Sequence, residues 1–471
     1  MSARVLWATV ALAFTSLAGA GSEAPDTARL ARADAVVRAE MRVEQIPGLG
    51  IAIVHRGKVV LARGYGYANI EHSAPVTLDT VFQSASVGKQ FTAAALMLLV
   101  EDGRLSLDDP VIRYLPEAPP EWSAIRIRHL LTHTAGVPDY RTETLSSDSR
   151  RSYTEKELVQ MVCASKLEFP PGARFSYSNP GYLLLGAIIG RVDGRHYSDV
   201  LAERVFRPLG MKSARQIDDA DIIMHRAAGY RLRNNHPANQ VWIAPENNKT
   251  ADGSLYLSIS DMIAWDRGLR EGRVLSSESW RTVFTPARLN SGRTYPYGFG
   301  WSLEEFAGQT VQSHSGGSQG FTTYISRYLG DDLSIIVLTN LAEGDPARIA
   351  RRVAAVLSDT LPLPQRTPIA DSDPARRLEL ERLLRVGRAG GLTAADLPHV
   401  RGGFAPDVAE WYRNTLEELG TLENLALVAR RPLGDDEYSE YLADFAKGRR
   451  VVTYTVDPQG RAADLDISEP D

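Results

Sequence analysis

The pattern of hydrophobic and polar positions predicts helices packed on an antiparallel sheet. Apolar residues recur every three or four positions over 27–41 and 346–357, which is typical of amphipathic helices. Strand-like apolar segments predict two hairpins, one over 50–65 that turns at Arg56-Gly57 and one over 322–339 that turns at Gly330-Asp331-Asp332. We expect both hairpins to pair in one sheet closed by the 346–357 helix, with a helical region inserted between them, so the fold class is α+β.

The last hundred or so residues have a different pattern and predict a small second α+β domain. A proline-rich stretch over 358–368 indicates a linker, which we place at 361–374 between a domain over 27–360 and another over 375–471. In the second domain the predicted helices are 375–386, 393–397 and 406–419, and the predicted strands are 422–430, 437–445, 450–456 and 461–467. We favour a passive packing role for it over a regulatory or substrate-capping role.

The amino terminus predicts an export signal over residues 1–20. Arg4 precedes an apolar run over 5–17 that ends at Ala18-Gly19-Ala20, so we expect cleavage after Ala20 and a periplasmic or secreted protein. The run is shorter than the roughly 20 residues that cross a bilayer, and no stable membrane anchor is expected. Cys163 is the single cysteine, so an intrachain disulfide cannot form.

Charge narrows the class of partner. The 471 residues carry a formal net charge of -5, and lysine and arginine are scattered along the chain, so we expect no nucleic-acid partner. We predict that Arg348, Arg351 and Arg352 are the solvated face of the 346–357 helix. A small-molecule or peptide substrate is expected, and the sequence does not indicate an oligomeric state.

Ser86 and Lys89 are the first candidate catalytic residues. They lie three residues apart where a strongly apolar helix begins, which places hydroxyl and amine on one helical face. Burial disfavours the charged form of an amine, so we expect Lys89 to accept the Ser86 proton and Ser86 to act as a nucleophile. Backbone N–H groups of the first turn then favour the oxyanion. Taken alone, the motif is also consistent with an N-cap serine beside a surface lysine.

A second motif contains Tyr177 and Asn179, in a loop that leads into an apolar helix. A tyrosine beside a lysine can move protons to a leaving group, and an asparagine amide can bond a substrate carbonyl. The alternative is an ordinary turn with a packed tyrosine, because serine, asparagine, proline and glycine cluster here.

A third motif contains His314, Ser315, Gly316 and Gly317 at the start of the second predicted hairpin. A glycine-rich edge strand lets a substrate backbone approach closely, and the Gly317 N–H is a candidate second oxyanion donor. The alternative is a turn that carries one hydrophilic histidine.

Taken together, Ser86-x-x-Lys89, Tyr177-x-Asn179 and His314-x-Gly316 resemble the signature of the serine β-lactamase and penicillin-binding protein superfamily, in its class C and esterase-like branch. The resemblance spans about 30–357 and implies a β-lactamase/transpeptidase-like fold with no metal or other cofactor. It implies three sets of site residues: catalytic Ser86, Lys89 and Tyr177; an oxyanion hole of Ser86 and Gly317; and substrate-binding Asn179, His314, Ser315 and Gly316. The second domain resembles the cystatin-like or NTF2-like modules appended to such hydrolases.

One departure bears on the substrate. Many lactamases and transpeptidases have Lys-Thr-Gly or Lys-Ser-Gly where this chain has His314-Ser315-Gly316. A histidine is mostly neutral at pH 7, given a reference pKa of about 6.5, and offers no permanent cation to a substrate carboxylate. The resemblance therefore implies a hydrolase of carboxylic esters or D-amino-acid peptides and amides. The alternatives are a β-lactamase or D,D-carboxypeptidase, and a penicillin-binding-like sensor or peptidoglycan-binding module without turnover.

Two other signals do not indicate sites. His129 and His133 have the spacing of a metal pair, but no glutamate lies between them and no third ligand is evident, so we assign them to a structural turn. Gly64-x-Gly66 lacks the third glycine and the strand-to-helix context of a dinucleotide site.

Overall fold

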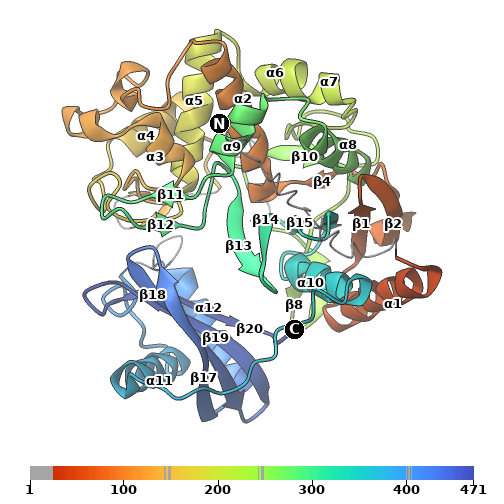
Figure 1. Cartoon of the computed structure of the whole chain (residues 1–471), viewed down its shortest axis with the longest axis vertical. Helices are drawn as coiled ribbons and strands as arrows, with labels where there is room; N and C mark the ends of the chain where they lie inside the picture. Colours follow the sequence, from red (N-terminus) through yellow and green to blue (C-terminus); the bar gives the residue numbers. More distant parts are fainter. Residues whose placement is uncertain are drawn as a thin grey trace, which may run out of the picture.

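A seven-stranded antiparallel sheet forms the centre of the larger domain, in the order β13-β14-β15-β16-β1-β2-β3 (Figure 1). The structure is a computed structural model that describes residues 25–142, 145–146, 150–241, 243–244, 249–398, 400, 404 and 406–471. The predicted export signal lies outside the described residues. The strands are β1 (Gly48–His55), β2 (Lys58–Asn69), β3 (Ala74–Pro75), β13 (Ser302–Phe306), β14 (Gln309–Ser318), β15 (Phe321–Tyr328) and β16 (Leu333–Thr339).

The two predicted hairpins meet where β1 pairs with β16, which confirms the expected sheet. Ile51 lies opposite Val337, and Ile53 lies opposite Ile335. Every residue of β1 is buried, because helices cover both faces of the sheet here. A strand covered on both faces has a continuous apolar run rather than an alternating pattern.

Helices α1 (Thr27–Val43) and α10 (Pro346–Leu357) cover one face of the sheet. Val37 of α1 and Val353 of α10 are fully buried in the same cluster as Ile51 and Ile335. The bounds of α10 coincide with the predicted helix, since a proline begins it and its apolar residues hold one helical face.

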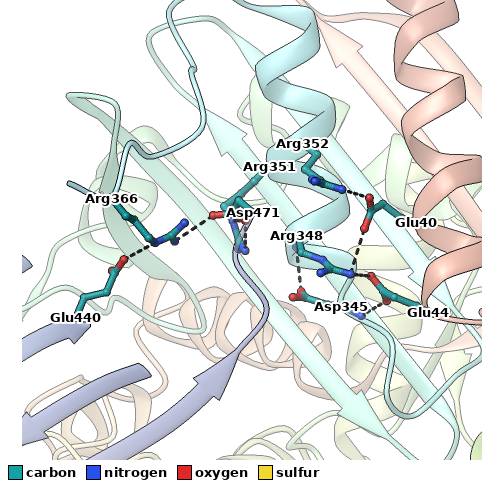
Figure 2. Close-up of polar contacts among 9 residues, drawn as sticks. All are labelled: Glu40, Glu44, Asp345, Arg348, Arg351, Arg352, Arg366, Glu440 and Asp471. Atoms are coloured by element: carbon teal, nitrogen blue, oxygen red, sulfur yellow. Dashed lines mark hydrogen bonds and ion pairs between the residues drawn. The ribbon is translucent and has the colours of Figure 1, made fainter. Parts of the chain in front are cut away.

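The arginines of α10 correct one prediction, because they are not a solvated face. The Arg348 side chain is 8% exposed and pairs with Glu40 of α1 at 3.1 Å and with Glu44, directly after α1, at 2.8 Å (Figure 2). Arg352 also pairs with Glu40, and Arg351 pairs with Asp471. The acidic partners lie far away in the sequence, so a helical periodicity argument could not detect them.

The other face of the sheet supports a mostly helical region around α2 (Lys89–Glu101). Every residue from 89 to 99 is buried, as expected for the helix after Ser86. The helices around it are α3 (Ile127–Leu131), α4 (Glu155–Cys163), α5 (Asn179–Asp193), α6 (Tyr197–Leu201), α7 (Arg207–Leu209), α8 (Ile259–Arg270) and α9 (Ser277–Val283). Short strands complete the region: β4 (Phe82–Gln83), β5 (Arg141–Thr142), β6 (Leu145–Ser146), β7 (Arg215–Gln216), β10 (Leu255–Leu257), β11 (Ala287–Arg288) and β12 (Thr294–Tyr295). The hairpin of β8 (Tyr230–Arg233) and β9 (His236–Asn239) instead packs through Tyr230 in the cluster that contains α1 and α10.

The second domain, which we call the C-terminal module, has a four-stranded antiparallel sheet in the order β17-β18-β19-β20. Its elements are α11 (Pro374–Arg388), α12 (Pro406–Leu419), β17 (Leu422–Leu433), β18 (Asp436–Phe445), β19 (Gly448–Val456) and β20 (Ala462–Ser468). Leu383 of α11, Tyr412 of α12 and Tyr441 of β18 belong to a core cluster separate from those of the larger domain. Figure 1 shows the module in blue, below β11 to β13 and beside α10.

The predicted helix over 393–397 is wrong, because this segment forms a turn. The Asp396 carboxylate accepts the backbone N–H and the hydroxyl of Thr393, at 3.0 and 2.8 Å. Side chains that bond nearby backbone groups in this way favour turns over helices. Within the described ranges, no helix combines the length and apolarity that crossing a bilayer requires.

Candidate active site

Ser86 lies in a tight turn immediately before α2. The 3₁₀ turn Ala85–Gly88 contains it, and the α-helix begins only at Lys89. Ala85 has a φ of +47°, a left-handed conformation that residues with a side chain rarely adopt. The Ser84 hydroxyl fixes the turn by donating to the Gly253 carbonyl at 2.8 Å. Both neighbours of Ser86 are buried whereas Ser86 is partly exposed, so the turn presents the Ser86 side chain outward.

Two glycines allow other backbone segments to approach this turn. A Cβ atom at Gly253 would lie 2.4 Å from the Ala85 carbonyl oxygen. A Cβ atom at Gly316 of β14 would lie 2.7 Å from the Ser84 carbonyl oxygen and 2.9 Å from the Ser86 nitrogen. The turn is therefore held between the segment before β10 and strand β14.

Lys89 connects the nucleophile candidate to the second motif. Its side chain is fully buried, and Nζ lies 3.0 Å from Ser86 Oγ and 2.8 Å from Asn179 Oδ1. A third bond runs from Nζ to the backbone carbonyl of Asp252. Nζ is also 4.9 Å from the centre of the Tyr177 ring, so the buried amine has polar partners and an aromatic face around it.

Asn179 is held at the first position of α5 and uses both ends of its amide. The Ser178 side chain caps the helix by accepting the Gly181 N–H at 3.2 Å. Asn179 Oδ1 accepts from Lys89, and Nδ2 donates to the Asp139 carboxylate at 3.2 Å. Burial raises the pKa of Asp139, while the Tyr140 backbone N–H and the Lys89 charge oppose that rise. The amide predicted to bond substrate thus also orients Lys89.

Tyr177 is buried and stacks on a histidine that the sequence did not assign to the site. The ring centres of Tyr177 and His133 lie 4.2 Å apart with an interplanar angle of 32°. His133 is 2% exposed and has a φ of +56°. Its turn, which we predicted to be structural, therefore also supports the candidate proton carrier.

Hydrogen bonds link His133 to His314 through Tyr297. The Ser178 backbone N–H donates to His133 Nδ1 at 3.1 Å, so this nitrogen carries no proton. The proton of the His133 ring is therefore on Nε2, which donates to the Tyr297 hydroxyl at 3.3 Å. That hydroxyl lies 2.9 Å from His314 Nε2, and His314 Nδ1 lies 2.6 Å from the Ser315 carbonyl, which can only accept. With both imidazoles neutral, each hydrogen in this series of hydrogen bonds has one acceptor.

The third motif lies on β14 where its pairing with β13 has ended. The β13–β14 register stops at Ser313, so residues from His314 to Ser318 pair only with β15. This part of β14 is the edge that the sequence predicted. Ser315 and Gly317 are exposed, and no atom lies within 4 Å of where a Cβ of Gly317 would stand. The strand therefore leaves space for a substrate beside Gly317. The role of the Gly317 N–H as an oxyanion donor stays a prediction.

The structure thus brings Ser86, Lys89, Tyr177 and Asn179 into one group, with Gly316 packed against the turn and His314 joined through Tyr297. This geometry agrees with a comparison of the chain with known families, in which residues 33–359 match the family described as Beta-lactamase.

The chain belongs to the beta-lactamase family.

Relatives of this beta-lactamase family chain include two curated proteins and one solved structure. Penicillin-binding protein 4* of Bacillus subtilis (strain 168) is 32% identical over 61% of this chain and 66% of its own length. A D-aminopeptidase of Brucella anthropi is 31% identical over 64% of this chain and 58% of its own length. The chain thus spans less than two thirds of the length of these two curated relatives. The octameric penicillin-binding protein homologue from Pyrococcus abyssi has a TM-score of 0.63 at 25% identity, with 92% of this chain and 94% of that chain covered.

In the part of the chain that the structure describes, no three histidine, cysteine, aspartate or glutamate side chains are grouped so that they could hold a metal ion. The Nδ1 atoms of His129 and His133 accept backbone N–H groups, from Arg126 and Ser178 respectively, each at 3.1 Å. Sequence reasoning missed His133 and Asp139, which lie in one loop between α3 and β5, and Tyr297, which lies in the loop between β12 and β13. The sequence had placed His133 only in a structural turn.

Proposed function

We propose that this protein is an exported, metal-independent acyl-serine hydrolase that acts on carboxylic esters or on D-amino-acid peptides and amides. The observation that carries the proposal is the 3.0 Å contact between Ser86 Oγ and the fully buried Lys89 Nζ. A buried amine beside a partly exposed hydroxyl is the arrangement that activates a serine nucleophile. Membership of the beta-lactamase family and the D-aminopeptidase relative support the same chemistry.

The bonds of Lys89 suggest how the Ser86 proton leaves. Two of its partners, Asn179 Oδ1 and the Asp252 carbonyl, can only accept hydrogen bonds. The two hydrogens of a neutral amine satisfy them and leave the lone pair directed at the Ser86 hydroxyl. Ser86 then attacks the substrate carbonyl, and Lys89 takes its proton.

Tyr177 and the edge of β14 would complete the cycle. The Tyr177 ring adjoins the Lys89 amine, so its hydroxyl is the candidate to pass the proton to the leaving group. The N–H groups of Ser86 and Gly317 would stabilise the oxyanion, and water would release the acyl group from Ser86.

The environment of His314 favours esters and D-amino-acid amides over β-lactams. Its ring is 3% exposed and both of its nitrogens are engaged within the protein, so it offers no free cation to a ring carboxylate. We therefore rank β-lactamase and D,D-carboxypeptidase activity below ester and D-amino-acid amide hydrolysis. A panel of short nitrophenyl esters, D-alanyl dipeptides and a chromogenic cephalosporin tests the order, and turnover of the cephalosporin alone would reverse it.

The decisive experiment is intact-mass spectrometry of the wild-type protein and of Ser86→Ala after treatment with a fluorophosphonate and, separately, with penicillin. We expect a fluorophosphonate adduct on the wild type only. A penicillin adduct that persists without turnover supports the sensor alternative, and no adduct from either reagent contradicts the proposal. Export is tested on the protein expressed with its natural amino terminus, which we expect to begin at Gly21 after secretion.

A further inference from the structure

The C-terminal module and the larger domain share one cavity, which begins at the candidate active site. Its volume is about 370 Å³, and Tyr177, His314 and Ser315 line one end. Strands of the module form the opposite wall with Arg431, Leu433, Asp436, Tyr438, Thr455, Ala463 and Asp464. A passive packing role, which the sequence favoured for the module, does not account for its strands lining this cavity.

Ion pairs fix the module wall against the larger domain. The Asp471 side chain is 2% exposed and accepts hydrogen bonds from Arg351 of α10 at 2.7 Å and from Arg366 of the linker at 3.2 Å. Arg366 also bonds Glu440 of β18 at 2.6 Å (Figure 2). Arg351 itself lines the cavity. The latch formed by Asp471, Arg351, Arg366 and Glu440 thus holds β18 beside the cavity.

The cavity is rich in aromatic side chains. Phe175 and Tyr295 stack with ring centres 3.8 Å apart, and Tyr297 and Tyr438 also line the space. Such walls suit the apolar middle of an elongated molecule.

Three arginines and three carboxylates line the cavity, and most of them have partners. Arg174 lies 3.9 Å from Glu168 and interacts with Asp436, while Arg351 pairs with Asp471. Glu304 accepts from the Ser302 hydroxyl and Asp464 from the Leu465 N–H.

Arg431 differs from the other cations of the cavity. Its guanidinium lies 4.6 Å from the centre of the Tyr438 ring. Arg431 is exposed, and within the described part of the chain it forms no ion pair, whereas the neighbouring Arg430 pairs with Asp371 and Glu437. A guanidinium backed by an aromatic ring and open to a cavity is suited to a carboxylate, which it can bind through two parallel hydrogen bonds.

We propose that the module supplies a distal substrate subsite, in which Arg431 binds a carboxylate at the far end of an elongated ester or amide whose carbonyl reaches Ser86. The inference rests on the proposed function and deepens it, because it names the class of substrate: acyl compounds with an apolar or aromatic middle and a terminal carboxylate. Short substrates occupy only the end near Tyr177 and do not meet Arg431.

The test compares four 4-nitrophenyl esters: the acetate, a monoester of a linear dicarboxylic acid, its methyl-capped analogue, and an analogue of equal length with a terminal ammonium. We expect Arg431→Ala to lower kcat/KM for the carboxylate ester by about tenfold or more, chiefly through KM, because it removes a charge-assisted hydrogen bond. The acetate and the capped ester should change little. Arg431→Glu should favour the ammonium ester instead.

Arg449→Ala is the matched control, since Arg449 is an exposed arginine of the same sheet that pairs with Asp444 and lies outside the cavity. Equal losses on all four esters, no loss on the carboxylate ester, or a wild-type preference for the ammonium ester would overturn the subsite. Binding of the carboxylate and capped esters to Ser86→Ala and to Ser86→Ala/Arg431→Ala, followed by calorimetry, separates the two proposals. If Ser86→Ala binds the carboxylate ester more tightly than the capped ester, and the added Arg431→Ala abolishes this preference, the subsite holds even if the wild type shows no turnover. If Ser86→Ala shows no such preference, the subsite is overturned.

Discussion

The Tyr297 hydroxyl and His314 Nε2 lie 2.9 Å apart in a buried region, and His133 Nε2 lies 3.3 Å from the same hydroxyl. Tyr297 is thus the link through which the loop that supports Tyr177 also sets the orientation of His314. The third motif of the site depends on a residue outside all three motifs.

Tyr297→Phe tests this link. The substitution keeps the ring but removes the hydroxyl, so two buried imidazole nitrogens lose a partner, at a cost of about 1–3 kcal/mol each if nothing replaces it. We expect a lower free energy of unfolding in urea and a lower kcat/KM, because His133 and His314 both lose the hydroxyl that orients them. Unchanged stability together with an unchanged kcat/KM would contradict this series of hydrogen bonds.

Gly316→Ala tests the approach of β14 to the nucleophile turn. The added Cβ would meet backbone atoms of residues 84 and 86 at less than 3.0 Å, so the strand or the turn must move. Overpacking of this kind costs about 1–3 kcal/mol, and a shift of the oxyanion geometry lowers kcat. We expect a smaller kcat on short esters and a lower urea midpoint. Gly317→Ala is the control for stability, because its Cβ would stand in open space, and its urea midpoint should match the wild type.

His129 predicts a pH dependence of stability. Burial lowers its pKa to about 4, with help from the charges of Arg128 and Arg126, while Asp108 opposes them. Because the unfolded chain binds the proton more tightly than the folded one, the free energy of unfolding falls as the pH drops from about 6.5 toward 4. His129→Gln, whose amide oxygen can still accept the Arg126 N–H, should flatten this part of the curve in urea titrations. An identical slope for both proteins would exclude His129 as the cause.

Asp471→Ala tests the latch. Removal of this carboxylate leaves the Arg351 guanidinium without its partner at the domain junction, and breaking a buried pair typically costs about 3 kcal/mol or more. We expect a lower urea midpoint and faster proteolysis in the 361–374 linker, with KM raised for long carboxylate esters but not for the acetate. Asp444→Ala, which breaks an exposed pair on the same module, should change neither proteolysis nor KM.

Local patterns were sufficient for elements whose signals lie close together in the sequence. The helix over 346–357 was predicted to the residue because its proline start and apolar face are local features, and both hairpins were found from apolar runs and turns. The strands of the module were located within about three residues by the same reasoning. The predicted helix over 393–397 failed because a single aspartate side chain favours a turn there.

The same distinction between local and long-range signals applies to the site residues. Ser86 and Lys89 are three residues apart, so helix geometry alone placed their side chains together, and the structure has them 3.0 Å apart. His133, Asp139 and Tyr297 come from loops up to 164 positions apart, and only the fold brings them to Tyr177, Asn179 and His314. The position of Arg431 in the cavity wall could not be predicted either, because no local sequence feature of β17 indicates which surface the strand faces.

The latch has a consequence for the order in which the protein matures. The larger domain is complete by residue 360, more than a hundred positions before Asp471 in the sequence, and domains usually fold in the order of their synthesis. A larger domain that has folded before the module docks can therefore hold an assembled serine–lysine pair while its cavity still lacks the module wall. In that state it would accept small esters without discriminating among long ones, so selectivity would follow from docking of the module and not from assembly of the serine–lysine pair.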